Sequence, residues 1–240
     1  ADLLARVTRK LKRTVAGLAS KYPNEARVQR LRDGFNPKKV CEILPTSAYT
    51  AYLFDLDGTL VDTAPDIMKG LNYALQQAAF ETVDELLTRR WVGHGARVLI
   101  EKALEHYGEN RPSQELLETM TSNFINHYAE HIADDSNPYP NVTSTLETLS
   151  NEGKQLGVVT NKAVHLARLL LKATELDQFM NVIVGGDSMQ VRKPAGEPAM
   201  YAMNELNVSS SATLFVGDAS TDVGCARSAG CDCVVYRYGY

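Results

Sequence analysis

No run of apolar residues in this sequence is long enough to cross a membrane. The longest falls well short of the roughly 18 residues that a transmembrane helix requires. The sequence also lacks a charged segment followed by a short apolar core, which would indicate a secretory signal. These absences argue against a membrane-spanning or exported protein, and we expect a cytoplasmic one.

Cysteine is scarce, with four residues among 240. Cys41, Cys225, Cys231 and Cys233 match no zinc-ligand spacing, and three of them lie close together near the C-terminus. We interpret all four as reduced thiols within packed structure. A reducing compartment agrees with the cytoplasmic expectation.

Charge is distributed unevenly over a composition that is otherwise ordinary for a globular protein, with 44% apolar and 22% charged residues. Residues 1–48 hold 11 Lys and Arg against 4 Asp and Glu, a net charge of +7. The other 192 residues hold 14 against 25, a net charge of −11. The contrast predicts that residues 1–48 form a separate, basic N-terminal extension.

This extension is predicted to be helical. Apolar residues recur at steps of three or four over residues 3–22, and a second short helix is expected over residues 25–32. A basic amphipathic helix suits a membrane surface, a targeting segment or nucleic acid. We favour packing of its apolar stripe on the rest of the chain or on a second subunit, and expect no nucleic-acid partner.

From residue 51 onward, strand-like and helix-like segments alternate. Short apolar segments predict five strands: Ala51–Phe54, Gln155–Thr160, Asn181–Val184, Thr213–Val216 and Cys233–Tyr236. Helical patterns separate the later strands: Val142–Asn151, Ala163–Ala173, Glu197–Leu206 and Thr221–Ala229. Apolar strands with helical crossovers predict an α/β fold, a doubly wound parallel sheet covered by helices on both faces.

Residues 64–135 interrupt this alternation, because they contain no good strand. Helical runs fill the interval instead: Pro65–Ala79, Thr82–Arg90, Ala96–Tyr107 and Ser113–Ile132. The returning segment carries Pro138 and Pro140 and is expected to form a stiff hinge strap. We therefore predict an α-helical cap over residues 64–135, inserted into an α/β core of residues 49–63 and 136–240.

Polar side chains follow the ends of several predicted strands. Asp55 and Asp57 come directly after the first strand, one residue apart, where they point to the same side and repel each other. The other strand ends add further polar residues, namely Thr160, Asn161, Lys162, Arg192, Lys193, Asp218 and Asp222. The carboxyl ends of parallel strands form the binding edge of such a sheet, so these groups are expected to converge.

Four converging carboxylates require positive charge. A hard divalent cation with oxygen ligands, with Mg²⁺ as the first candidate, would neutralise them. An aspartate held by that ion and facing a lysine stays ionised and is able to attack an electrophile. Lysine, a threonine hydroxyl and N–H groups of a glycine loop suit a phosphoryl group. This pattern favours metal-assisted phosphoryl transfer through an aspartyl-phosphate.

Four segments resemble, in order, the signature motifs of the haloacid dehalogenase superfamily. They are "DLDGTLVDT", "VVTNK", "RKP" and "GDASTD", and the resemblance covers residues 50–240. Within the superfamily the chain is most similar to the phosphoglycolate phosphatase group, on "DLDGTLVDTAPD", "WVGHGARVLIEKAL", "NPYP", "VIVGGD" and "YGY". The resemblance implies a Rossmann-like core with a helical cap between the first two motifs.

The resemblance also implies the roles of the first pair of carboxylates. Asp55 would be the nucleophile that takes the phosphoryl group. Asp57 would protonate the leaving alkoxide and then activate water. Superfamily members that release halide lack this second aspartate because halide needs no proton, so Asp57 favours a phosphate ester over a carbon–halogen bond.

The remaining motif residues would hold the metal and the phosphoryl group. Asp55, the backbone carbonyl of Asp57, and Asp218 would bind Mg²⁺, with Asp222 acting through metal-bound water or by steadying the lysine. Thr160 and Asn161 would bind phosphate oxygens, and Lys193 would balance the charge. Gly58 would let the backbone approach the phosphate closely.

A glycine-flanked loop in the cap is the candidate for substrate selection. Gly93, His94 and Gly95 precede a predicted helix that carries Arg97. In the phosphoglycolate phosphatase group the corresponding loop reads the substrate, so His94 or Arg97 would meet a substrate carboxylate. The alternative is a simple turn between helices with an exposed histidine.

We therefore expect a Mg²⁺-dependent phosphatase for a small phosphate monoester, with 2-phosphoglycolate as the first candidate. Other small substrates stay open, including a sugar phosphate, a nucleotide or pyrophosphate, as does a phosphomutase activity like that of β-phosphoglucomutase. A further alternative is an interaction or membrane-docking protein that uses residues 1–48 to bind its partner or to form homo-oligomers.

Overall fold

A computed structural model describes residues 49–236 and 239–240. Contacts between Cα atoms divide the chain into Ala1–Ala48 and Tyr49–Tyr240. The two helices predicted over residues 3–22 and 25–32, and Cys41, lie outside the described residues. Within the described ranges, no helix is long and apolar enough to span a membrane.

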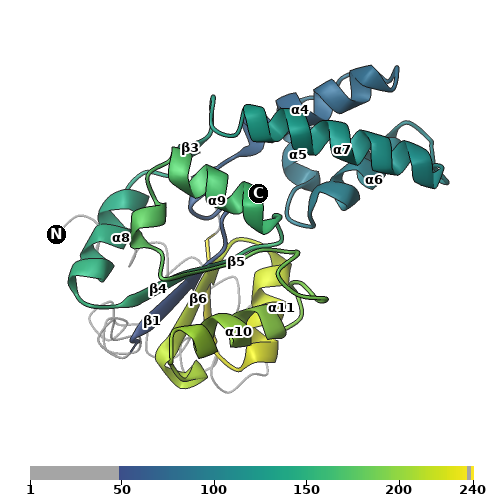
Figure 1. Cartoon of the computed structure of the whole chain (residues 1–240). Helices are drawn as coiled ribbons and strands as arrows, with labels where there is room; N and C mark the ends of the chain where they lie inside the picture. Colours follow the sequence, from purple (N-terminus) through teal and green to yellow (C-terminus); the bar gives the residue numbers. More distant parts are fainter. Residues whose placement is uncertain (1–48, 237–238) are drawn as a thin grey trace, which may run out of the picture. The chain divides into compact units, whose positions relative to one another are not determined.

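A five-stranded parallel sheet forms the centre of the core, in the order β5-β4-β1-β6-β7 (Figure 1). The strands are β1 Ala51–Phe54, β4 Gln155–Val159, β5 Val182–Val184, β6 Thr213–Gly217 and β7 Asp232–Val235. In the register, Ala51 pairs with Gln155 on one side and Thr213 on the other. All four residues of β1 are buried, as expected for a central strand with helices on both faces.

Two pairs of helices cover the sheet. Figure 1 shows α8 and α9 on one face and α10 and α11 on the other. Their bounds are α8 Val142–Asn151, α9 Val164–Ala173, α10 Glu197–Glu205 and α11 Ser220–Ala229. On the second face, Leu53 and Phe215 from the sheet pack against Ala202 and Cys225 from the helices. The predicted doubly wound α/β fold is confirmed.

Four helices lie between the first two strands of this sheet. They are α4 Ala64–Gln77, α5 Glu85–Trp91, α6 Ala96–His106 and α7 Gln114–Glu130, and no strand occurs between residues 64 and 135. They share an apolar core that includes Leu71, Leu104, Met120 and Phe124. A Cβ atom at Gly70 would lie 3.3 Å from the Phe124 ring, so α4 and α7 pack closely there. The exact domain boundaries stay a prediction.

The two segments that connect these helices to the core pair with each other. β2 Val61–Asp62 and β3 Asn137–Pro138 form a short antiparallel ladder in which Val61 faces Pro138. The sequence analysis did not anticipate this ladder, because two residues are too few to show an alternating pattern. The segment expected to form a strap is therefore one side of a two-stranded connection.

Asp66, in the first turn of α4, fastens the second connection to the start of the first helix. One of its carboxylate oxygens accepts hydrogen bonds from Asp135 N at 2.9 Å, Ser136 N at 2.7 Å and Ser136 Oγ at 2.7 Å. Its other oxygen accepts a bond from Lys69 Nζ at 2.9 Å. Burial raises the pKa of Asp66, but the hydrogen bonds from these donors lower it by more, so the net pKa lies below the usual 3.8.

Replacing Asp66 with alanine should destabilise the fold. The variant leaves two backbone N–H groups without their acceptor, so we expect a loss of about 2–4 kcal/mol in the free energy of unfolding, measured with urea. A carboxylate with a lowered pKa stabilises the folded state above its unfolded pKa. That contribution is lost as the pH falls through the lowered pKa, so the stability of Asp66→Ala should depend less on acidic pH than that of the wild-type protein.

The exposed carboxylate of Asp134 provides the matched control for this prediction. Asp134→Ala should change the unfolding free energy by no more than about 0.5 kcal/mol. An equal loss in both variants would show that Asp66 does not fasten the connection.

Candidate active site

The polar residues predicted at the strand ends do converge. Asp55 directly follows β1, Thr160 directly follows β4, and Asp218 directly follows β6. Asp222 lies in the first turn of α11. One carboxylate oxygen from each of Asp55, Asp218 and Asp222 lies within 4.8 Å of the others, an arrangement able to hold a metal ion. Hard oxygen donors of this kind suit Mg²⁺ in charge and chemistry.

Lys193 neutralises two of these carboxylates. Its Nζ atom lies 2.8 Å from Asp55 Oδ1 and 2.6 Å from Asp222 Oδ1. Burial lowers the pKa of Lys193, but the nearby carboxylates of Asp55 and Asp222 raise it by more, so the net pKa is above its usual value. The side chain is only 1% exposed. A fixed ammonium therefore faces Asp55 from inside the protein. The charge-balancing role that the "RKP" motif implies for Lys193 stays a prediction, and this contact supports it.

Asp222 is fully occupied in holding this arrangement. While Oδ1 accepts a bond from Lys193, Oδ2 accepts bonds from Asp218 N at 3.0 Å and Ala219 N at 2.9 Å. Of the two roles expected for Asp222, these contacts favour the steadying of Lys193.

Burial controls the acidity of Asp55. It raises the pKa of Asp55 to about 7, with Lys193 acting in the opposite direction and Asp222 in the same one. A divalent cation beside Asp55 would favour the ionised form. The nucleophile assignment stays a prediction, and the lysine contact supports it.

Asp57 has different partners from Asp55, although the two are one residue apart. Asp57 Oδ1 accepts a hydrogen bond from Thr63 Oγ1 at 2.6 Å and lies 2.9 Å from Lys162 Nζ. Thr63 is the N-cap residue of α4, so the segment that leads from the core into the helices positions Asp57. The two aspartates therefore have separate environments, which a division between nucleophile and proton carrier requires.

Gly58 meets Asp218 in the structure. Its φ angle is +81°, and a Cβ atom there would lie 2.6 Å from Asp218 Oδ2. Thr59 Oγ1 donates to Asp218 Oδ1 at 2.7 Å. The loop after β1 thus sets the position of a predicted metal ligand. The sequence analysis expected Gly58 to make room for phosphate, and that role stays a prediction.

Asn161 links three segments. Its Nδ2 atom donates to Gly93 O at 2.9 Å and to Lys193 O at 3.1 Å. Its Oδ1 atom is buried and has no hydrogen-bond partner within the described part of the chain. Both amide hydrogens are thus engaged with backbone carbonyls, and a phosphate contact through the side chain would compete with them. The predicted roles of Asn161 and Thr160 in phosphate binding stay predictions.

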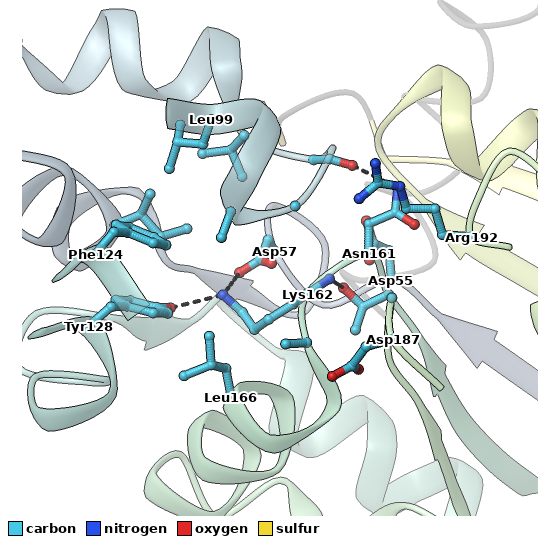
Figure 2. Close-up of a pocket in the computed structure, with 18 residues that line it drawn as sticks. Asp55, Asp57, Leu99, Phe124, Tyr128, Asn161, Lys162, Leu166, Asp187 and Arg192 are labelled. Atoms are coloured by element: carbon cyan, nitrogen blue, oxygen red, sulfur yellow. Dashed lines mark hydrogen bonds and ion pairs between the residues drawn. The ribbon is translucent and has the colours of Figure 1, made fainter. Parts of the chain in front are cut away.

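A cavity of about 170 Å³ opens beside these residues (Figure 2). Asp55, Asp57 and Asn161 line it from the core, and Leu99 and Phe124 line it from the helices inserted after β1. The volume is below the roughly 300–1,000 Å³ usual for drug-sized ligands. The site therefore favours a small molecule.

The predicted loop residues divide into two groups. Gly93 and Gly95 line the cavity, but His94 and Arg97 do not. Both side chains are exposed, and Arg97 contacts Glu101 of α6 and Gln114 of α7. The part assigned to His94 and Arg97 in substrate selection stays a prediction without a cavity contact to support it.

Lys162 follows Thr160 and Asn161 within "VVTNK", and the sequence analysis gave it no separate role. Lys193 was preferred to Lys162 as the charge-balancing lysine because the proline that follows Lys193 matches the motif. The structure places Lys162 in the cavity wall, between Asp57 and Tyr128 (Figure 2). The position of the residue within the motif was a usable signal.

Tyr240 joins the metal-ligand cluster to the beginning of α4. It belongs to the "YGY" segment that supports the family resemblance, but the sequence analysis gave it no role. Its backbone N–H donates to Asp218 Oδ2 at 2.9 Å. Its hydroxyl oxygen accepts bonds from Thr63 N at 2.6 Å and Ala64 N at 2.7 Å. The contact spans about 180 residues of sequence, so periodicity and motif spacing do not reveal it.

Comparisons with known proteins agree with this site. The sequence profile of the haloacid dehalogenase-like hydrolases matches residues 52–236. A phosphoglycolate phosphatase from Yersinia pestis is 36% identical over 187 residues, 78% of this chain and 80% of that protein. One from Mannheimia succiniciproducens is 38% identical over 191 residues, 78% of this chain and 85% of that protein.

A solved structure shows the same fold. The crystal structure described as a predicted phosphoglycolate phosphatase from Haemophilus somnus is 34% identical and has a TM-score of 0.76. The match covers 80% of this chain and 87% of that one. The chain belongs to the haloacid dehalogenase-like hydrolase family. Its predicted enzyme class, phosphoric monoester hydrolase, is confirmed by the family match and these relatives.

Replacing Gly58 with alanine should weaken metal binding. The added Cβ atom would displace Asp218 Oδ2, so we expect the Kd for Mg²⁺ to rise by about tenfold or more, measured by calorimetry without substrate. Gly153→Ala is the matched control, since Gly153 has a φ of +71° and nothing within 4 Å of the Cβ position. Both variants carry similar backbone strain, and only the first should lose metal affinity.

Proposed function

We propose that this protein is a Mg²⁺-dependent phosphatase that hydrolyses 2-phosphoglycolate to glycolate and phosphate through an aspartyl-phosphate intermediate. The observation that carries the proposal is the contact of Lys193 with Asp55 at 2.8 Å, next to two further carboxylates. A buried carboxylate needs such an ammonium if it is to attack a phosphoryl group, which is itself negatively charged.

Mg²⁺ would be held by the side chains of Asp55 and Asp218 and by the backbone carbonyl of Asp57, with Asp222 supporting Lys193. When bound, the ion would neutralise charge on the phosphoryl oxygens and the attacking carboxylate. The loop after β1 holds Asp218 through Thr59, and Tyr240 holds its other oxygen. This chain therefore orients its metal ligands with its own hydrogen bonds.

Asp55 and Asp57 would carry out different steps of the reaction. Asp55 would attack phosphorus while Lys193 balances its charge, and Thr160 and Asn161 would orient the phosphoryl oxygens. Asp57, oriented by Thr63 Oγ1 at 2.6 Å, would give a proton to the leaving alkoxide. The same group would then take a proton from the water that hydrolyses the aspartyl-phosphate.

The size of the cavity supports a small leaving group. About 170 Å³ beside Asp57 suits glycolate better than a nucleotide. The relatives named phosphoglycolate phosphatase support the same choice. Apolar side chains of Leu99 and Phe124 enclose the space on one side and would exclude water during the reaction.

Replacing Asp55 with asparagine should abolish turnover of 2-phosphoglycolate. We expect kcat to fall by at least about 10³-fold, because an amide does not form the covalent intermediate. Asp177→Asn removes an exposed carboxylate and should keep wild-type kinetics. Phosphate release with Mg²⁺ and with EDTA, together with circular dichroism of both variants, provides the measurement. Near-normal activity of Asp55→Asn would remove the nucleophile assignment.

Product analysis separates hydrolysis from phosphoryl transfer. With 2-phosphoglycolate and with a panel of sugar phosphates, nucleotides and pyrophosphate, we expect the highest kcat/KM for 2-phosphoglycolate and only free phosphate as the second product. A phosphorylated sugar formed by transfer to a second hydroxyl would indicate a mutase instead.

A further inference from the structure

Besides Lys193, the site holds a second buried cation, Lys162, and this one lines the cavity. Lys162 lies in the loop after β4 and is 8% exposed. Its Nζ atom lies 2.9 Å from Asp57 Oδ1, 3.0 Å from Tyr128 OH and 4.5 Å from the centre of the Tyr128 ring. Figure 2 shows the ammonium between these two side chains. Lys162 therefore joins the predicted proton carrier to a helix of the inserted segment.

The ammonium of Lys162 retains a donor for a ligand. It carries three N–H donors, of which Asp57 and Tyr128 use two. The third has no partner among residues 49–236 and 239–240. Burial lowers the pKa of Lys162, but Asp57 and Tyr128 raise it by more, so the ammonium stays charged.

The surroundings strengthen the attraction of this cation for an anion. Leu99, Phe124 and Leu166 line the same cavity, and the low polarity of such a wall strengthens the attraction between opposite charges. Asp187 also lines the cavity, but its Oδ1 atom already accepts a bond from Val164 N at 2.7 Å. A ligand anion would meet Lys162 with little competition from solvent.

The position of Lys162 relative to Asp57 indicates which part of a substrate it meets. Asp57 would protonate the ester oxygen, so that oxygen lies within hydrogen-bond reach of its carboxylate. Lys162 contacts the same carboxylate from the side of Tyr128. Atoms bonded to the ester oxygen thus lie next to the ammonium. In 2-phosphoglycolate, a single methylene separates that oxygen from a carboxylate.

We infer that Lys162 is a substrate-binding residue that selects phosphate esters whose leaving group carries an anion close to the ester oxygen. The inference rests on the proposed function and assigns substrate selection to the core loop after β4 and to Tyr128. It differs from the earlier expectation that His94 or Arg97 meets the substrate carboxylate.

Two esters of nearly equal size test this inference. The leaving group of 2-phosphoglycolate ends in a carboxylate, and that of 2-hydroxyethyl phosphate ends in a neutral hydroxyl. For Lys162→Met we expect the ratio of kcat/KM values, first ester over second, to fall by about 10- to 100-fold, the loss of one charge-assisted hydrogen bond. The ratio cancels effects on folding or on Asp57, because these act on both esters.

Two further variants complete the comparison. Lys172→Met removes an exposed lysine of α9 and should leave the ratio unchanged. Arg192→Met removes the other cation that lines the cavity within the described part of the chain, and it should change the ratio much less than Lys162→Met does. If Lys162→Met lowers both kcat/KM values equally, or if Arg192→Met alone changes the ratio, the inference is wrong.

Binding of the product tests the same contact without turnover. Calorimetric titration with glycolate, and with ethylene glycol as its neutral counterpart, should show glycolate binding in the wild-type protein and its loss in Lys162→Met. If the wild-type protein hydrolyses neither ester with Mg²⁺, the proposed function fails. In that case, equal glycolate binding by both proteins, or no binding by either, would overturn the inference as well.

Discussion

The contact of Lys193 with Asp55 and Asp222 is the interaction on which the rest of the site depends. Three carboxylates crowd together at the carboxyl end of a buried sheet, and without this ammonium their repulsion would oppose the fold. Asp222 fixes the lysine and in turn is fixed by two backbone N–H groups. The remaining negative charge is what makes the site suitable for a divalent cation. One buried ion-pair network therefore serves both the stability of the core and its proposed chemistry.

The second aspartate links this network to the inserted helices. Asp57 lies within the core, yet its partners are Thr63 at the start of α4 and Lys162 beside Tyr128 of α7. Any displacement of α4 or α7 relative to the sheet would alter these contacts. Proton transfer and the enclosure of the substrate are thus coupled through the same side chains, whereas Asp55 is held entirely by the core.

The main parts of the fold follow from local sequence patterns. β1 and α8 have the predicted bounds because apolar runs and helical periodicity extend over several residues. The helix expected from Thr82 begins at Glu85 instead, because Asp84 accepts a bond from Leu87 N and caps it. Contacts between distant segments were not predictable. The Tyr240 hydroxyl at α4 and the two-residue pairing of β2 with β3 leave no periodic trace. Lys162 was visible in its motif, but only the structure shows which groups it meets.

The pairing of β2 with β3 also bears on how such a protein changes during evolution. Because Asp66 binds the backbone of residues 135 and 136, the inserted segment leaves the core and returns to it at nearly the same place. The entropy of closing a loop grows only slowly with its length, so an insertion with adjacent ends adds little to the cost of folding the core. Segments of different length and shape are therefore exchangeable at this position without rebuilding the sheet. A lineage is thus free to acquire a new substrate preference while its reaction centre stays intact.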